Sequence, residues 1–337
     1  MKILVTGHTG FKGSWLTVML KQLGHEVHGI ALNPEEKSLF KIAEIKSYLS
    51  GDHRVDIRNQ EDIRECISLI NPDVLIHLAA QPLVRLSFSK PIETFDINVM
   101  GTINILESTR LLTNLKSTLI ITTDKVYKNV GKFDGYRESD QLGGKDPYSA
   151  SKAAADIATQ SWRESFGKFP IAIARAGNVI GGGDWAQDRL IPDLVNAIST
   201  KSKIKVRYPH SIRPWQHVLD CLNGYITLIN KQLNEGVQGE WNFGPSSASN
   251  KTVTDVLNAF SIAWNSKLEA EIITADLPEA PLLTLDSSKS ESALQWFDRL
   301  DFESSIEWTS EWYKHFFSNS DMKMFTEKQV CKFLELF

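Results

Sequence analysis

The chain has 337 residues, of which 42% are hydrophobic and 23% charged, as is usual for a globular protein of two domains or of one domain with a large lobe. The net charge of −4 argues against nucleic-acid binding, and the three cysteines are too far apart to suggest a disulfide scaffold or a metal site. No apolar run approaches the length of a membrane span, and "MKILVTG" is not a signal peptide, so we expect a cytoplasmic protein with no membrane partner.

The first half of the chain alternates strand and helix patterns. Strand patterns cover residues 2–7, 26–32, 73–80, 117–123 and 171–179, and helix patterns cover residues 15–23, 60–70, 98–112 and 148–166. Such alternation predicts an α/β fold, a Rossmann-like doubly wound parallel sheet with helices on both faces. We expect this domain to span residues 1–176 with a return around 214–240, and a smaller C-terminal substrate-binding lobe to span 177–213 and 241–337.

A glycine loop follows the first strand directly. In "GHTGFKG", Gly7, Gly10 and Gly13 allow a tight turn and a close approach to a pyrophosphate, while the following helix offers free amide groups. A plain glycine turn is the alternative, but the position between the first strand and the first helix favours a dinucleotide site. The second strand lacks the usual ribose-binding acid and offers only Asn33, and no arginine replaces it, so NAD is favoured and NADP stays open.

Two further groups carry chemistry. "TTDKVY" places Asp124 and Lys125 at the tip of a buried strand, where a lysine is unexpected unless it faces a cleft. "YSASK" places Tyr148 and Lys152 four residues apart, on one face of a helix. A phenol near an ammonium has a stabilised phenolate and can act as a base, although a surface pair is the alternative for this short motif taken alone.

These motifs together resemble the extended short-chain dehydrogenase/reductases, the family of NAD-dependent epimerases and dehydratases. The segments "GHTGFKG", "DIR", "HLAAQ", "NVMGT", "TTDKVY", "PYSASK" and "RAGNVIGGGDW" follow that family's order over nearly the whole chain. Longer segments, such as "ARAGNVIGGGDWAQDRLIPDL" and "RPWQHVLD", resemble its CDP-glucose 4,6-dehydratase branch. The resemblance implies tightly held NAD that is reduced and reoxidised within one cycle, no metal, and a homodimer or a dimer of dimers through helices like those at 98–112 and 148–166.

The resemblance also carries over site residues. The catalytic set would be Thr123, Asp124, Lys125, Tyr148 and Lys152. The cofactor-binding set would be Gly7, Gly10, Phe11, Gly13, Asp56, Ile57, Leu78, Ala79, Ala80, Gln81, Asn98, Thr122, Tyr148 and Lys152. Asp56 could hydrogen-bond the adenine, with a loop carboxylate as the competing interpretation.

The later loops supply candidates for substrate binding. They are Asn178, Arg189, Arg207, Arg213 and His217. Arginine binds a diphosphate bidentately, and although a solvated side chain is the ordinary explanation for each arginine alone, their grouping favours an anion site.

The expected reaction converts CDP-glucose to CDP-4-keto-6-deoxyglucose and water, with no net redox change. Asp124-Lys125 departs from the Asp-Glu of the broad sugar-dehydratase pattern, which puts a dTDP-sugar substrate in doubt. Three alternatives remain open: a nucleotide-sugar 4-epimerase, a dehydratase acting on another nucleotide hexose, and a binding protein that keeps the dinucleotide fold without catalysis.

Overall fold

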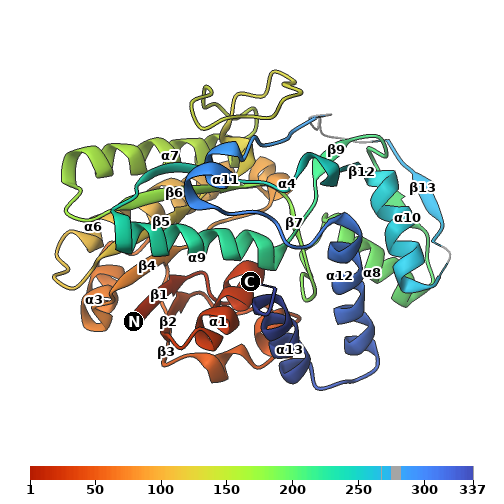
Figure 1. Cartoon of the computed structure of the whole chain (residues 1–337), viewed down its shortest axis with the longest axis horizontal. Helices are drawn as coiled ribbons and strands as arrows, with labels where there is room; N and C mark the ends of the chain where they lie inside the picture. The colour runs from red at the N-terminus through yellow and green to blue at the C-terminus, as the bar shows by residue number, and fades with distance from the viewer. Residues whose placement is uncertain (267, 275–281, 337) are drawn as a thin grey trace.

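A seven-stranded parallel sheet forms the centre of the molecule (Figure 1). The computed structural model describes residues 1–266, 268–274 and 282–336. The strand order is β11-β6-β5-β4-β1-β2-β3, so the chain winds outward in both directions from β1 and β4. The strands are β1 (Lys2–Thr6), β2 (Glu26–Ala31), β3 (Gly51–Arg54), β4 (Val74–His77), β5 (Ser117–Ile121), β6 (Ile171–Ala176) and β11 (Gly239–Phe243). This is the predicted doubly wound fold.

Helices bury both faces of this sheet. The main helices are α1 (Phe11–Gln22), α3 (Gln60–Ile70), α6 (Gly101–Thr109), α7 (Pro147–Phe166) and α9 (Val218–Glu235). Alternate residues of β1 enter different cores: Ile3 and Val5 pack in the cluster that contains α1 and α9, whereas Leu4 packs in the cluster of α3 and α6. Strands β4, β5 and β6 are buried along their whole length, as expected when both faces of a parallel sheet are covered.

The sequence signals mark most helix boundaries correctly. Asp146 accepts a hydrogen bond from the Ser149 amide at the start of α7, and Pro147 is its first residue. Asn71 ends α3 with a φ of +45°. The helix predicted over 98–112 differs in detail, because a π-helical turn, η2 (Asp96–Met100), precedes α6.

A smaller lobe lies at one end of the sheet (Figure 1). It contains β7 (Val179–Ile180), α8 (Leu190–Thr200), β8 (Ile204–Val206), β9 (Ile212–Pro214), β10 (Gln216–His217), β12 (Asn250–Thr252), α10 (Val253–Trp264), β13 (Ala270–Ile272) and α12 (Phe302–Phe317). Short helices α2 (Leu39–Ile42), α4 (Val84–Ser89), α5 (Pro91–Phe95) and α11 (Ser288–Leu294), with the single turns η1 (Ile45–Tyr48), η3 (Asp124–Val126) and η4 (Ser247–Ser249), complete the connections.

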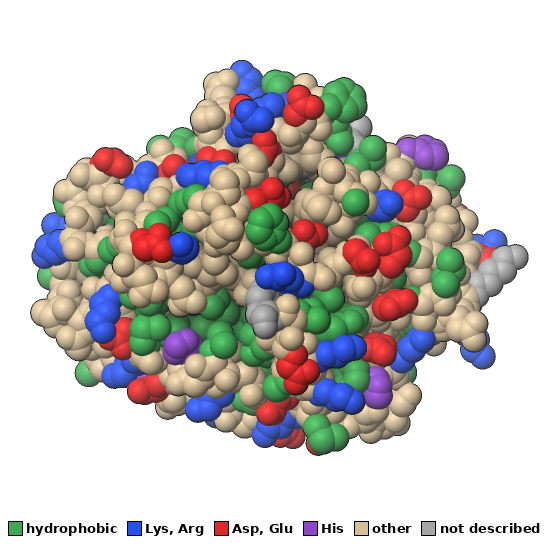
Figure 2. All heavy atoms as spheres, viewed as in Figure 1, with side chains coloured by type: hydrophobic (Ala, Val, Ile, Leu, Met, Phe, Trp, Pro, Cys, Tyr) green, Lys and Arg blue, Asp and Glu red, His purple; other side chains and the backbone are tan. Residues whose placement is uncertain are grey.

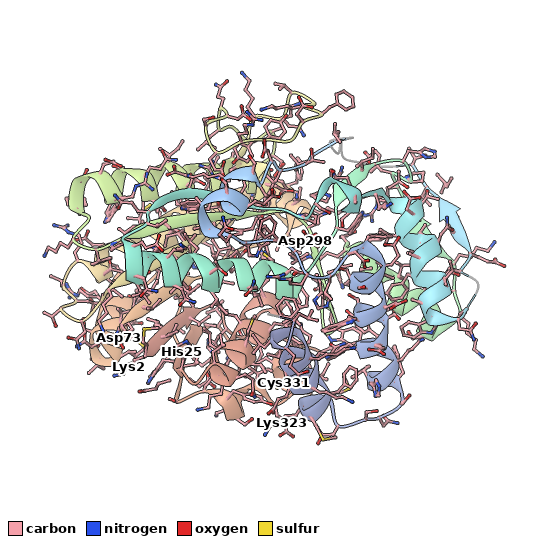
Figure 3. The ribbon with its side chains drawn as sticks, in the orientation of Figure 1. Lys2, His25, Asp73, Asp298, Lys323 and Cys331 are labelled. Carbon is pink, nitrogen blue, oxygen red and sulfur yellow. The ribbon has the colours of Figure 1, made fainter. Side chains whose placement is uncertain are left out.

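The C-terminal helix α13 (Met322–Leu334) returns to the first domain. Figure 3 labels Lys323 and Cys331 on it, and Glu327 accepts hydrogen bonds from Gln22 of α1 and from Tyr48. We propose that the first domain includes α13 and all of β11, beyond the return expected around 214–240, because both pack directly on its elements.

On the face drawn in Figure 2, acidic and basic side chains are interspersed and form no single basic patch. Among the residues that the structure describes, no helix is both long and apolar enough to cross a membrane.

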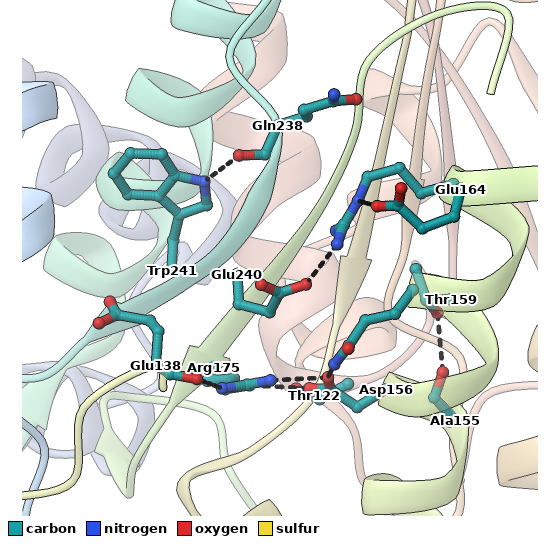
Figure 4. Close-up of polar contacts among 12 residues, drawn as sticks. Thr122, Glu138, Ala155, Asp156, Thr159, Glu164, Arg175, Gln238, Glu240 and Trp241 are labelled. Carbon is teal, nitrogen blue, oxygen red and sulfur yellow. Dashed lines mark hydrogen bonds and ion pairs between the residues drawn. The ribbon is translucent and has the colours of Figure 1, made fainter. Parts of the chain in front are cut away.

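A buried ion pair joins three elements behind the sheet edge (Figure 4). Arg175 of β6 donates from Nε and Nη2 to the two carboxylate oxygens of Asp156 on α7, at 2.8 and 2.7 Å. Thr122, which follows β5, donates to the same carboxylate at 3.2 Å. Arg175 and Asp156 are 1% and 0% exposed, so neither charge has water as a substitute partner.

We therefore predict that Asp156→Asn lowers the free energy of unfolding by about 3–5 kcal/mol, because it leaves a buried guanidinium without its counter-charge. Urea denaturation followed by circular dichroism measures the change. Glu235→Gln, which removes an exposed carboxylate paired with Lys231, should cost no more than about 1 kcal/mol. Equal stability losses in the two variants would contradict the importance of this pair.

Candidate active site

One elongated cavity of about 1140 Å³ contains most of the predicted site residues. It runs along the carboxyl edge of the sheet, past the ends of β1, β4, β5 and β6, and on into the loops of the smaller lobe, the usual position for ligands in this architecture. Its lining includes Gly7, Gly10, Phe11, Gly13, Asp56, Ile57, Leu78, Ala79, Ala80, Thr122, Thr123, Lys125, Tyr148, Lys152, Asn178, Arg189, Arg207 and Arg213.

The glycine loop is shaped as a dinucleotide cradle. Gly7 has a φ of +76°, and a Cβ there would lie 2.7 Å from the Ala79 amide nitrogen. A Cβ on Gly13 would lie 2.2 Å from the Gly7 carbonyl oxygen, so neither position has room for a side chain. Helix α1 begins beside the loop, and its N-cap Gly10 has no side chain to occupy the first amide groups. These features fit a pyrophosphate held by backbone amides.

The opposite end of the cofactor region carries one carboxylate. Asp56 lines the cavity, and its two oxygens accept hydrogen bonds from Arg58, at 3.1 and 3.0 Å from Nε and 2.6 Å from Nη2. These bonds lower the pKa of Asp56, so it is a carboxylate near neutral pH. At the end of β2 the cavity is lined by Ala31 and Leu32, which supply neither an acid nor a base for the ribose.

The "TDK" segment forms a connected group at the tip of β5. The Thr123 hydroxyl donates to Asp124 Oδ1 at 2.9 Å, and Lys125 Nζ donates to the same oxygen at 3.0 Å. Lys125 also donates to Asn178 Oδ1 at 3.3 Å. Lys125 faces the cavity, as its position at a strand end predicts, whereas Asp124 is fully buried and its Oδ2 has no hydrogen-bond partner among the described residues.

Helix α7 presents Tyr148 and Lys152 to this group. Burial raises the pKa of the Tyr148 phenol, and the Lys125 ammonium is the strongest influence that lowers it, followed by a hydrogen bond with Thr123. Burial and the charge of Lys12 lower the pKa of Lys152 to about 8. The Lys152 ammonium donates to the Ile121 carbonyl at 2.8 Å. Lys125 is thus the cation that most lowers the pKa of the Tyr148 phenol, whereas the four-residue spacing along the helix predicts Lys152 for this role.

The predicted anion-binding arginines are held by acidic or backbone partners. Arg189 donates to Asp184 at 2.9 Å, and Arg207 donates to Asp188 at 2.7 Å. Arg213 is 3% exposed and donates to the Ile212 carbonyl at 2.8 Å. All three line the cavity; Arg213 is buried, whereas Arg189 and Arg207 are 34 and 32% exposed.

Three predicted binding residues lie outside the cavity lining. Gln81 and Asn98 bond each other, with the Gln81 amide donating to Asn98 Oδ1 at 2.8 Å, so they brace the loop after β4 from behind. His217 is fully buried at the start of α9, where its Nδ1 accepts from the Leu219 amide. Burial lowers the pKa of His217 to about 3, so it is neutral and cannot serve as a cation for a phosphate.

The sequence prediction misses several charged residues of the lining, and three of them are Lys12, Arg85 and Asp188. Lys12, in the glycine loop, donates to the Tyr225 hydroxyl at 3.1 Å. Arg85 follows the loop after β4, and Asp188 precedes α8. A lysine inside a glycine loop is a signal that the sequence offers, but nothing local distinguishes Arg85 or Asp188 from ordinary surface residues.

Comparisons with known proteins agree with this geometry. Residues 3–244 match the model of the NAD dependent epimerase/dehydratase family. The CDP-glucose 4,6-dehydratase of Salmonella typhimurium is 39% identical over 345 residues, covering 99% of this chain and 96% of that protein. The dTDP-glucose 4,6-dehydratase 1 of Escherichia coli is 27% identical over 345 residues, covering 93% of this chain and 92% of that protein.

Solved structures share the fold at lower identity. The dTDP-glucose 4,6-dehydratase of Bacillus anthracis in complex with NAD superposes with a TM-score of 0.81 at 23% identity, covering 97% of this chain and 99% of that one. The UDP-glucose 4-epimerase of Thermus thermophilus in complex with NAD gives a TM-score of 0.81 at 22% identity, covering 93% and 99%.

The contacts of Tyr148 predict how its ionisation responds to Lys125. Removing the ammonium in Lys125→Met takes away the strongest influence that lowers the pKa of Tyr148, so the phenolate should form only at higher pH. Titration of ¹³C-labelled tyrosine by NMR measures this, with the Tyr148 signal identified by its loss in Tyr148→Phe. Lys132→Met, which removes a lysine paired with Asp140, should leave the titration in place. An unchanged Tyr148 midpoint in Lys125→Met would contradict the assignment.

Proposed function

The chain belongs to the NAD dependent epimerase/dehydratase family, and we propose that it converts CDP-glucose to CDP-4-keto-6-deoxyglucose and water. The observation that carries this proposal is the Asp124–Lys125 pair at the tip of β5, joined through Thr123 to the Tyr148 phenol. A dehydratase needs an acid and a base beside the sugar in addition to the group that deprotonates the C4 hydroxyl. The identity to the Salmonella typhimurium protein supports CDP-glucose as the substrate.

NAD, when bound, would supply the hydride transfer that links C4 and C6 of the sugar. The glycine loop and the amide groups of α1 would hold its pyrophosphate, and Asp56 would face its adenine. Lys152 would bond the nicotinamide ribose; its burial on the cavity wall one helical turn from Tyr148 supports this role.

In the first stage, Tyr148 acts as the general base. Its phenolate removes the C4 hydroxyl proton, and the neighbouring Lys125 ammonium favours that phenolate. Thr123 lies between these groups: its hydroxyl donates to Asp124 Oδ1 at 2.9 Å and is beside the Tyr148 phenol.

In the second stage, the new 4-ketone acidifies the C5 proton, and the C6 hydroxyl leaves. Lys125 must be neutral to remove the C5 proton, and Asp124 must be protonated to donate to the leaving hydroxyl. The single 3.0 Å hydrogen bond between Lys125 Nζ and Asp124 Oδ1 allows one proton transfer to create both states. Asp124 Oδ2 is buried directly behind the cavity lining, where a Cβ on the lining residue Gly177 would lie 3.2 Å from it.

A 4-epimerase is the second candidate function, favoured by the fold shared with the Thermus thermophilus enzyme. An epimerase uses the glycine loop, Tyr148 and Lys152, but its reaction breaks no C–O bond at C6. It therefore has no use for the Asp124–Lys125 pair, which is why we place it second.

We also propose that two copies associate through the face formed by α5, η2 and α7. Ile92, Met100 and Ile157 are 85, 47 and 55% exposed on these three elements, which pack against one another. Sedimentation equilibrium tests this proposal. We expect the mass of a dimer, and the mass of a monomer would contradict the association.

Incubation with CDP-glucose tests the proposed reaction. We expect an ultraviolet-absorbing 4-keto-6-deoxy sugar under alkaline conditions from CDP-glucose in preference to the dTDP-, GDP- and UDP-sugars. Tyr148→Phe should lower the rate by about 10²–10⁴-fold, since no general base remains at C4. Formation of CDP-galactose would establish the epimerase instead, and lack of turnover with every nucleotide sugar would leave a binding protein.

The role of Lys125 is tested at C5. If Lys125 is the base, Lys125→Met should still oxidise C4 at sufficiently high pH, accumulate the reduced cofactor, and fail to exchange the C5 hydrogen with solvent. Mass spectrometry of the sugar after incubation in D₂O measures the exchange. Normal deuterium incorporation at C5 by this variant would show that Lys125 is only the charge partner of Asp124.

A further inference from the structure

One carboxylate bridges the two sides of the cavity at its arginine-rich end. Asp188 Oδ1 accepts a hydrogen bond from Arg207 Nη2 at 2.7 Å and lies 3.6 Å from Arg85 Nε. Arg85 belongs to α4, beside the sheet, whereas Arg207 follows β8 in the smaller lobe. Two guanidinium groups from different lobes therefore point at one negatively charged oxygen, and all three residues line the cavity.

The loop that carries Asp188 is anchored by the residues before and after Asp188, but not by Asp188 itself. Trp185 packs against Trp312 and Tyr313 of α12, and Arg189 is tied to Asp184. Asp188 itself has a φ of +61°, a left-handed conformation that aspartate and asparagine tolerate better than most residues. Its side chain is 38% exposed and forms ion pairs with the two arginines.

The bridge is weak enough for a ligand to replace. Each of the three side chains is about one-third exposed, at 35% for Arg85, 32% for Arg207 and 38% for Asp188, so solvent screens their attraction. A diphosphate carries more negative charge than a carboxylate and more acceptor oxygens, and it matches the paired donors of a guanidinium. It would therefore compete well for these two arginines.

We propose that Arg85 and Arg207 bind the diphosphate of the nucleotide substrate, and that Asp188 occupies their site in the free enzyme as an internal anion that the substrate displaces. This inference rests on the proposed function, because it requires a substrate with a diphosphate, but it does not depend on the nucleobase or on the sugar chemistry. Asp188 holds the two arginines in place across the cavity before binding, at the cost of competing with the ligand.

Calorimetric titration of the NAD-saturated protein tests this, with CDP and inorganic pyrophosphate as probes and the dinucleotide site already filled. Asp188→Asn keeps the side-chain shape and the tolerance for positive φ but removes the charge, so both probes should bind about three- to fivefold more tightly. Arg85→Gln should weaken both by roughly tenfold or more, with Arg85→Lys intermediate because it keeps the charge and loses the paired donors.

Two controls separate displacement from general electrostatics. Glu235→Gln changes the net charge equally at an exposed pair with Lys231 outside the cavity and should leave both affinities unchanged. In an Arg207→Gln background the gain from Asp188→Asn should shrink, because the carboxylate then blocks only one arginine. Thermal unfolding checks that each variant remains folded.

The outcomes are distinct. Unchanged or weaker probe binding by Asp188→Asn would overturn the displacement, and unchanged binding by Arg85→Gln would overturn the two-arginine site. Tighter binding of UDP or dTDP than of CDP would contradict the assignment of CDP-glucose. This inference would still stand if the variants changed the affinities for all nucleoside diphosphates alike.

Discussion

The active site depends on the buried ion pair between Asp156 and Arg175. It joins β6 to α7, and through Thr122 it also reaches the end of β5. The residues proposed for catalysis lie on two of these three elements: Thr123 to Lys125 directly follow β5, and Tyr148 and Lys152 are on α7, the latter one turn before Asp156. Because water cannot satisfy either charge, the ion pair resists changes in the distance between α7 and β6. The contacts of Tyr148 on α7 with Thr123 and Asp124 after β5 depend on this distance.

The lysine at position 125 gives the site two properties that an acid there would not. It places a cation beside the Tyr148 phenol, where burial alone would hold the proton on the oxygen. It also shares a hydrogen bond with Asp124, so the pair can exist as two charges or as two neutral groups. A carboxylate at position 125 would oppose the Tyr148 phenolate, and it would have no proton to give to Asp124. In the proposed reaction, the Lys125 ammonium therefore takes part first in forming the phenolate and then in the proton transfers at C5 and C6.

Charge balance also organises the substrate end of the cavity. Arg189 and Arg207 are each held by a carboxylate of the same loop, Asp184 and Asp188. The first pair is nearly enclosed on its acidic side, with Asp184 at 7% exposure, and it fixes the loop; the second is open to solvent on both sides. The same loop thus contains one enclosed ion pair, Arg189 with Asp184, and one open pair, Arg207 with Asp188, whose carboxylate a charged ligand can replace.

The sequence by itself determined the fold, the glycine cradle and the group at residues 123–125 and 148–152, because each depends on local patterns: buried strands, glycines before a helix, and spacing along one helix. It could not place His217, Gln81 and Asn98, whose side chains turn away from the cavity into the protein. It could not find Arg85 or Asp188, which are 103 positions apart and meet only when α4 and the loop before α8 face each other. Tertiary packing decided those contacts, since the direction of a side chain and the partners of a charge are set by elements distant in the chain.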